Sequence, residues 1–226
     1  MLLNDEWSVL INEIRNCQKC PLSRTRINAV PGEGSERAEI MIVGEAPGAT
    51  EDETGRPFVG IAGSLLRKIM KDIGLREDEV YITNVVKCRP PNNRTPEKEE
   101  IIACSDYLRR QIKMIKPKIV ITLGNVAGEW FFNENKMKWN GISRQHGRKY
   151  ELEVSGHRFK LIPSYHPSAA VRGSVDPDII REDLLKALEE LNKQNRGSSE
   201  RIKTLYDYLS RDSQTSTSRD SSKVKH

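Results

Sequence analysis

Four cysteines are the residues with which this chain could bind a metal. They occur as C-x2-C at Cys17 and Cys20 and then, after 67 residues, as C-x15-C at Cys88 and Cys104. Four thiolates can close a zinc site or hold a [4Fe–4S] cluster, because both take four soft ligands in a roughly tetrahedral array. Two disulfides, or free thiols, are the alternative, and disulfides would indicate an oxidising compartment or a hyperthermophile. The spacing alone does not choose among these.

A loop rich in glycine and proline, VGEAPGATEDETGRPFVG from Val43 to Gly60, follows an apolar run and precedes a helical pattern. It has neither the spacing of a Walker loop nor that of a Rossmann loop, so it is not a standard phosphate-binding loop. Its carboxylates would also repel a polyphosphate: Glu45, Glu51, Asp52 and Glu53. The loop therefore favours a neutral ligand or one approached by backbone amides, and a solvated turn is the alternative.

Alternating strand and helix patterns must position these residues. We expect strands near residues 39–45, 80–88, 118–124, 148–154 and 157–163, with a Ser-Gly turn between the last two. We expect helices near residues 5–17, 60–75, 97–116, 125–132 and 177–191. This order predicts an α/β fold, a three-layer α/β/α sandwich around a mostly parallel central sheet.

Composition limits the organisation of the chain and its location. The formal charge is +5, but residues 193–226 hold 8 basic and 4 acidic residues, which leaves 29 basic and 28 acidic residues before them. Phosphate binding is therefore only weakly indicated by charge. We expect one domain over residues 1–195 and a polar, disordered tail over residues 196–226. With no long apolar run and no signal-peptide pattern, the chain is expected to be cytoplasmic and to contact no membrane.

Three stretches carry a family resemblance: GEAPGATEDETGRPFVGIAGSLL, TNVVKCRPPNNRTP and SYHPSAAVR. Together they closely resemble the family-4 uracil-DNA glycosylases of the iron–sulfur, thermophile type, in the same order over residues 7–192. The four cysteines fall where that family ligates its [4Fe–4S] cluster. The resemblance implies a uracil-DNA glycosylase-like fold and monofunctional excision of uracil from single- or double-stranded DNA, which begins base-excision repair. Such an enzyme would act as a monomer at the nucleoid.

Excision requires a flipped base, a group that reads its Watson–Crick edge and a donor for the charge on the departing base. Phe58 is the candidate stacking face, although it could be an ordinary core residue. Asn84, at the end of a strand, can accept from uracil N3–H and donate to O4, or could merely cap a turn. His166 would donate to O2 as a neutral imidazole, or could hold a proline-flanked turn.

The group that orients the water nucleophile is less obvious. Another glycosylase family uses an aspartate where this chain has Ala46, which we expect to contact uracil instead. The resemblance indicates Glu51 and Asn93 as a pair that organises the site, and Glu45 as a negative charge near the sugar, with its backbone against the base. We also expect Glu51, or the backbone near Ala46, to exclude the C5-methyl group of thymine.

DNA contacts are expected beyond the pocket. Arg172 would enter the duplex or grip a flanking phosphate, with Val171 and Ser168 beside it, and a solvated arginine is the alternative. Leu205, Tyr208 and Leu209, in the segment 202–209, match a degenerate sliding-clamp peptide, or they simply extend the last helix.

Two other functions stay open at this point. A related glycosylase could act on hypoxanthine or xanthine, which would keep the fold and change the pocket. A non-catalytic iron–sulfur DNA-binding module is the second alternative, although it would not require a complete base-reading set.

Overall fold

The computed structural model describes the backbone of residues 3–216 and the side chains of residues 6–196. The chain divides into a unit of residues 1–187 and a unit of residues 188–226. All described strands belong to the first unit, and so do the helices that precede Pro177.

Six strands form a single sheet in the order β1-β3-β2-β4-β6-β5. Their bounds are β1 Glu33–Gly34, β2 Ile40–Gly44, β3 Val80–Asn84, β4 Ile119–Leu123, β5 Tyr150–Val154 and β6 His157–Ser164. β2, β3, β4 and β6 pair in parallel, while β1 and β5 pair antiparallel at the two edges. Every residue of β2, β3 and β4 is buried, which explains why their sequences are continuous apolar runs.

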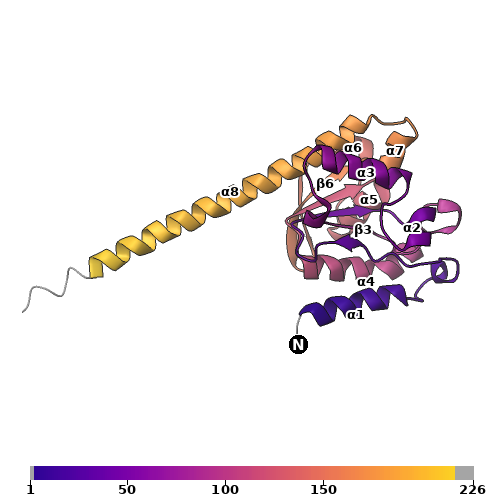
Figure 1. The fold of residues 1–226 in the computed structure, drawn as a ribbon, viewed down its shortest axis with the longest axis horizontal. Helices are drawn as coiled ribbons and strands as arrows, with labels where there is room; N and C mark the ends of the chain where they lie inside the picture. Colours follow the sequence, from indigo (N-terminus) through magenta and orange to yellow (C-terminus); the bar gives the residue numbers. More distant parts are fainter. Residues whose placement is uncertain (1–2, 217–226) are drawn as a thin grey trace, which may run out of the picture. The chain divides into compact units, whose positions relative to one another are not determined.

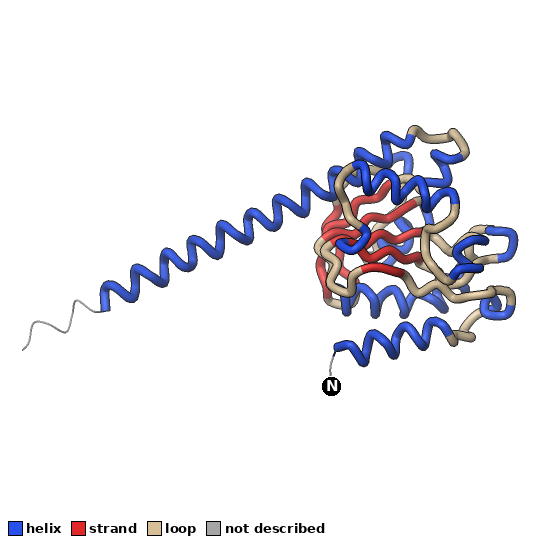
Figure 2. Tube along the Cα trace, in the orientation of Figure 1, coloured by secondary structure: helices blue, strands red, loops and turns tan. Residues whose placement is uncertain are grey.

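The helices cover both faces of this sheet. Their bounds are α1 Leu3–Arg15, α2 Ala49–Thr54, α3 Ile61–Asp72, α4 Lys98–Ile115, α5 Asn125–Glu134, α6 Ile142–Gln145, α7 Pro167–Val171 and α8 Pro177–Ser216. Short 3-10 turns lie at Pro21–Arg24, Glu77–Glu79 and Pro91–Asn93. Figures 1 and 2 show α1 and α4 on one side of the strands and α3 on the other. The predicted three-layer α/β/α sandwich is therefore confirmed.

The core on the α1–α4 face shows how the sequence pattern builds a layer. Leu10 of α1 and Leu108 of α4 are fully buried, and they belong to one apolar cluster with Met41 and Val120 of the sheet. Helical spacing places such residues on one stripe of each helix, and burying that stripe supplies most of its stability.

The turn between β5 and β6 has the predicted form, whereas the last helix is longer than predicted. The β5–β6 hairpin turns at Ser155 and Gly156, both with positive φ, as a two-residue turn between twisted strands requires. The last helix was expected to end near Leu191, but α8 continues to Ser216, so the backbone there is helical where we expected an irregular tail. The boundary at residue 195 stays a prediction.

Among the residues that the structure describes, no helix combines the length and the apolar character needed to cross a membrane. The segment 202–209 belongs to α8, but its side chains lie outside the described ones. The sliding-clamp contact therefore stays a prediction, as does the monomeric state.

Candidate active site

A cleft of about 770 Å³ lies at the carboxyl ends of the parallel strands. Its walls come from the loop after β2, the end of β3, the start of α5 and the loop after β6. This is where ligands bind in open α/β sheets, because the loops there converge from neighbouring strands. The cleft brings together all seven residues predicted for base recognition and catalysis: Glu45, Ala46, Glu51, Phe58, Asn84, Asn93 and His166.

Phe58 lies on one wall of the cleft with its backbone in the left-handed region (φ 52°). Its ring faces the ring of His166 at 5.7 Å between centroids. A Cβ atom at Gly44 would come within 2.5 Å of the Phe58 ring, and one at Gly63 would come within 2.0 Å of the Phe58 backbone. Both glycines are therefore required, because any side chain there would displace the ring.

Asn84 ends β3 and is 2% exposed. Its Oδ1 atom is buried and accepts no hydrogen bond from any described residue, although the side chain lines the cleft. An unsatisfied buried acceptor costs about 1–3 kcal/mol, so a native structure that keeps one calls for an explanation. A ligand N–H group in the cleft would satisfy it.

Lys87 positions Asn84. This role of Lys87 was not predicted from the sequence. Its Nζ atom is buried and donates to the Asn84 carbonyl oxygen (2.7 Å), to Thr83 Oγ1 (2.6 Å) and to Gln111 Oε1 (2.7 Å). These bonds fix the end of β3, where Asn84 lies, to Gln111 of α4. A lysine next to a cysteine gives no sequence signal for such a role, because lysine is normally a surface residue.

His166 is the N-cap residue of α7, and its ring tautomer is determined by its neighbours. The backbone N–H of Ser168 donates to its Nδ1 atom (3.1 Å), so Nδ1 carries no proton. The proton of a neutral ring must then be on Nε2, which makes that atom a donor. Burial, and after it the charge of Arg172, lower the pKa of His166 to about 4, and Glu51 opposes the shift. The neutral imidazole expected from sequence is thus what the surroundings favour.

Glu45 follows β2 directly and is partly buried in the cleft. Burial raises the pKa of its carboxyl group above the ordinary value. Its backbone oxygen accepts from Val86 N–H (3.0 Å), which ties the loop after β2 to the chain after β3. The side chain makes no ion pair or hydrogen bond with the residues described, so the carboxylate is available to a ligand.

Glu51 holds the loop between α2 and α3 closed. Its Oε1 atom accepts from the backbone N–H groups of Val59 (2.9 Å) and Gly60 (2.7 Å), and its Oε2 atom accepts from Gly48 (3.1 Å). These three bonds form a clip that places Phe58 in the cleft. No local sequence pattern predicts this clip, and the water-orienting and thymine-excluding roles of Glu51 stay predictions.

Asn93 lies in the 3-10 turn Pro91–Asn93 with φ 54° and lines the exposed rim of the cleft. Arg89 Nε donates to its Oδ1 atom (2.7 Å), and this bond orients the amide. Asn93 and Glu51 thus line the same cleft from different loops, and their joint action on the water stays a prediction.

The predicted DNA-contacting residues lie at the mouth of the cleft. Arg172, the C-cap residue of α7, is exposed and lines the cleft, while Val171 is 46% exposed and does not line it. Ser168 has a more specific place than predicted, because its Oγ atom is 2.8 Å from His166 Nδ1. Roles in DNA binding stay predictions for all three.

The four cysteines are free thiols that line one small cavity, together with Arg26 and Tyr107. Cys88 Sγ accepts from Arg26 Nη1 (2.9 Å), and Cys104 Sγ accepts from Lys87 N–H (3.3 Å). All four are unpaired, so the alternative of two disulfides is not formed.

Among the residues that the structure describes, no group of three or more His, Cys, Asp or Glu side chains is arranged to hold a metal ion. The four thiols line one cavity, and they are the soft ligands that a zinc site or a [4Fe–4S] cluster takes. Burial raises the pKa of Cys104 to about 12, so an unligated thiol here stays protonated.

Comparison with known proteins gives a family match. Residues 31–192 match the Uracil DNA glycosylase superfamily. This range contains the whole cleft and the sheet from β1 to β6.

Three curated relatives are similar to this chain over most of their length. A type-4 uracil-DNA glycosylase of Saccharolobus solfataricus is 47% identical over 191 residues, covering 84% of this chain and 88% of that protein. One of Archaeoglobus fulgidus is 45% identical, covering 88% of this chain and 97% of its own. One of Thermotoga maritima is 41% identical, covering 86% and 100%.

The surroundings of His166 predict an unusual titration. The ring should stay neutral as the pH falls through 6.5, the ordinary histidine value, and should gain its proton only near pH 4. Nuclear magnetic resonance of the ¹⁵N-labelled ring, assigned with a His166→Gln variant, checks both the titration and the proton on Nε2. Protonation of this ring near pH 6.5, or a proton on Nδ1, would contradict this prediction.

Proposed function

This chain belongs to the uracil DNA glycosylase superfamily, and we propose that it removes uracil from DNA in the cleft described above. It is a uracil-DNA glycosylase, an enzyme that hydrolyses the bond between the sugar C1′ and the base N1 and so serves DNA repair. Because DNA is its substrate, we further propose that it acts inside the cell, at the nucleoid. We also propose that it acts as a monomer.

The observation that carries the proposal is the unpartnered Oδ1 atom of Asn84, buried at the cleft. Uracil presents an N3–H donor beside the O4 acceptor, and the Asn84 amide offers the complementary acceptor and donor. Cytosine presents an acceptor at N3 and a donor at C4, so it would leave the same amide mismatched. Phe58 supplies a flat apolar face for the flipped base, next to this amide.

His166 stabilises the departing base. As the N-glycosidic bond lengthens, negative charge develops on uracil O2, and the Nε2–H group donates a hydrogen bond to that atom. Because the pKa of His166 is low, the ring is neutral, and a neutral imidazole N–H is a much weaker acid than uracil. The Nε2–H group therefore donates a hydrogen bond without transferring its proton, and uracil leaves as an anion. The Ser168 N–H group keeps the ring in the donating tautomer.

Glu45 acts on the sugar side of the bond. The transition state has oxocarbenium character, and a carboxylate nearby stabilises the positive charge on the sugar. Burial strengthens Glu45 as a proton acceptor, which suits it to receive a proton from the attacking water. Asn93 and Glu51 line the same cleft, and we assign them to the placement of that water.

Thymine differs from uracil only by the C5-methyl group, so its exclusion requires a wall that leaves no room for one carbon atom. We assign this wall to Glu51 and Ala46, which follow β2 on one side of the cleft. The clip made by Glu51 makes such a wall stiff, since its carboxylate is bound by three backbone N–H groups.

Neither alternative function is favoured. Hypoxanthine and xanthine are purines, and the named relatives are uracil-DNA glycosylases. A binding module without activity would have no use for a histidine held in one tautomer in the cleft.

The cysteine cavity supports a [4Fe–4S] cluster, with Cys17, Cys20, Cys88 and Cys104 as its four ligands. When bound, the cluster would supply structural cohesion by joining α1, the chain after β3 and α4. Arg26 and the Lys87 N–H group would stabilise the ligand sulfurs through their hydrogen bonds to Cys88 and Cys104.

Metal analysis tests the cofactor independently of activity. The protein, purified without oxygen, should contain about four iron and four sulfide per chain and should absorb broadly in the visible range. A Cys104→Ser variant should lose most of the iron and unfold at lower temperature, because ligand binding contributes to folding. One zinc per chain and no colour would contradict the assignment.

Arg172 is proposed to contact DNA at the mouth of the cleft, with Val171 and Ser168 beside it. If it fills the space left by the flipped base, Arg172→Ala should slow excision from duplex DNA more than from single strands, where no stack must be replaced. Equal rates for the variant and the wild type on both substrates would rule this out.

The activity itself is tested with an oligonucleotide that carries one uracil, followed by alkali to cut the abasic site. We expect cleavage at uracil only. His166→Ala should lower the rate by about 10²–10³, the usual loss when one donor to a developing charge is removed. His157→Ala is the matched control, because His157 begins β6 at the opposite end from the cleft. No cleavage by protein with an intact visible spectrum would overturn the proposed function.

A further inference from the structure

The segment between α5 and β5 concentrates positive charge in a chain that is otherwise close to neutral. Residues 136–149, which we call the basic loop, contain five basic residues and no acidic residue. All five side chains are exposed: Lys136, Lys138, Arg144, Arg148 and Lys149. The first 192 residues together hold 29 basic and 28 acidic residues, so the basic loop is a local excess.

This charge is not neutralised locally. Four side chains of the basic loop make no ion pair or hydrogen bond with any described residue: Lys136, Lys138, Arg144 and Arg148. Arginines on other elements are paired, since Arg109 of α4 pairs with Glu134 (2.7 Å) and Arg158 of β6 pairs with Glu153 (2.9 Å). The basic loop therefore has a positive electrostatic potential that ion pairs within the described residues do not neutralise.

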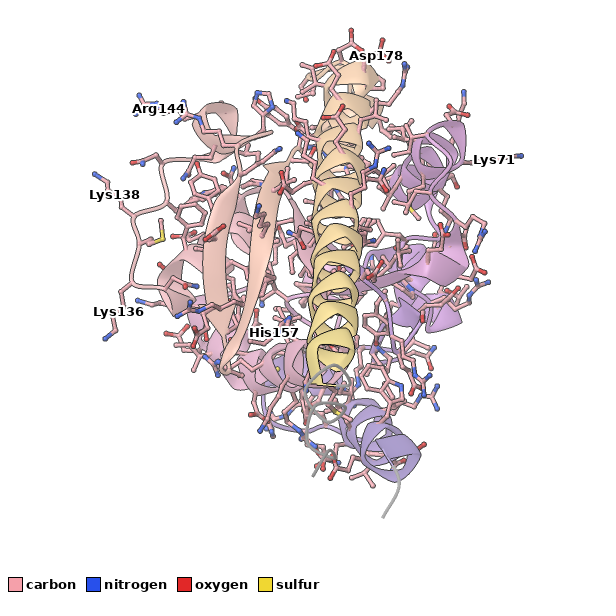
Figure 3. All side chains as sticks on the ribbon, turned by 90° about the vertical axis from the view of Figure 1, so that its left-hand side faces the viewer. Lys71, Lys136, Lys138, Arg144, His157 and Asp178 are labelled. Carbon is pink, nitrogen blue, oxygen red and sulfur yellow. The ribbon has the colours of Figure 1, made fainter. Side chains whose placement is uncertain are left out.

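An open groove of about 720 Å³ runs along the basic loop. Lys138, Arg144 and Arg148 contribute to its lining, together with Met137 and Tyr150. Cations that follow a groove lined by an aromatic ring are what a nucleic-acid strand needs, because phosphates bind the cations and bases stack on the ring. Figure 3 shows Lys136, Lys138 and Arg144 projecting outward along one flank of the sheet.

The backbone of the basic loop is held firmly, so the groove is built into the fold. Asn125 Oδ1 accepts from the Ile142 N–H group (2.9 Å) and from Trp139 Nε1 (3.2 Å). At the other end, Gly147 N–H donates to the Pro163 carbonyl oxygen (2.8 Å).

The basic loop also touches the active site. Asn125 and Ile142 line the cleft that holds Asn84 and His166, and the next residues after Ile142 line the groove. A strand that leaves the cleft would therefore meet Arg144 first.

We propose that the basic loop and its groove bind the phosphate backbone of the DNA strand that flanks the target nucleotide. This inference rests on the proposed function, and it assigns that function a second, sequence-independent contact outside the base pocket. Binding there would hold the strand while the target base enters the cleft, and it would make excision depend on the length of flanking DNA.

A triple variant tests the proposal: Lys138→Gln, Arg144→Gln and Arg148→Gln together. The matched control is Lys68→Gln, Lys71→Gln and Lys113→Gln, which removes the same charge from exposed lysines of α3 and α4. Affinity for a uracil-free single strand of about 25 nucleotides is measured by fluorescence anisotropy at salt concentrations from about 0.05 M to about 0.3 M. Each single-strand phosphate contact contributes about 0.7 to the slope of log affinity against log salt, so the triple variant should lose about 2.

The same variants are then compared on uracil oligonucleotides of about 5 and about 25 nucleotides, sizes chosen to lack or to include the flanking contacts. The triple variant should excise uracil from the short substrate as the wild type does and lose the advantage of the long one. Lys138→Arg, Arg144→Lys and Arg148→Lys together should retain both, which separates lost charge from lost structure. A triple variant that matches the control in affinity and salt slope would overturn the inference. Failure of the wild type to excise uracil from either substrate would instead overturn the proposed function.

Discussion

Parallel pairing of four strands is the constraint on which the site depends. In register, Gly44 of β2 lies beside Asn84 of β3, and Leu123 of β4 lies beside Ser164 of β6. The chain leaves each strand at the same edge, so four distant parts of the sequence supply one cleft. Without this register Asn84 would be an isolated amide at the end of a strand.

At that edge of the sheet, hydrogen bonds within the protein hold the side chains of the cleft in positions suited to catalysis. The Glu51 carboxylate accepts hydrogen bonds from three backbone N–H groups, and these bonds place Phe58. The Ser168 N–H group donates to His166 Nδ1, which leaves the other ring nitrogen as a donor. Lys87 does the same for the end of β3. Each of these bonds is made before any ligand arrives, so little reorganisation is needed when charge develops on the base.

The sequence predicted the layers and the members of the cleft better than it predicted their partners. Mostly apolar runs predict β2, β3 and β4, and two strand patterns on either side of a Ser-Gly turn predict β5 and β6, whereas β1, with two residues, has no such pattern. Phe58 and His166 lie in short sequence motifs, and a motif specifies residue types at fixed spacing, so both residues could be predicted as part of the cleft. The clip at Glu51 and the buried Lys87 were missed, since a contact between residues far apart in the sequence leaves no local pattern.

The packing of Gly44 and Gly63 against Phe58 has a genetic consequence. A Cβ atom at either position would overlap the ring or its backbone, at 2.5 Å and 2.0 Å. Every missense change of a glycine codon adds a Cβ atom, so neither codon has a harmless amino-acid replacement. Heritable variation in which base is recognised is therefore expected at other residues that line the cleft, such as Ala46 and Glu51, while the two glycines that pack against Phe58 stay unchanged.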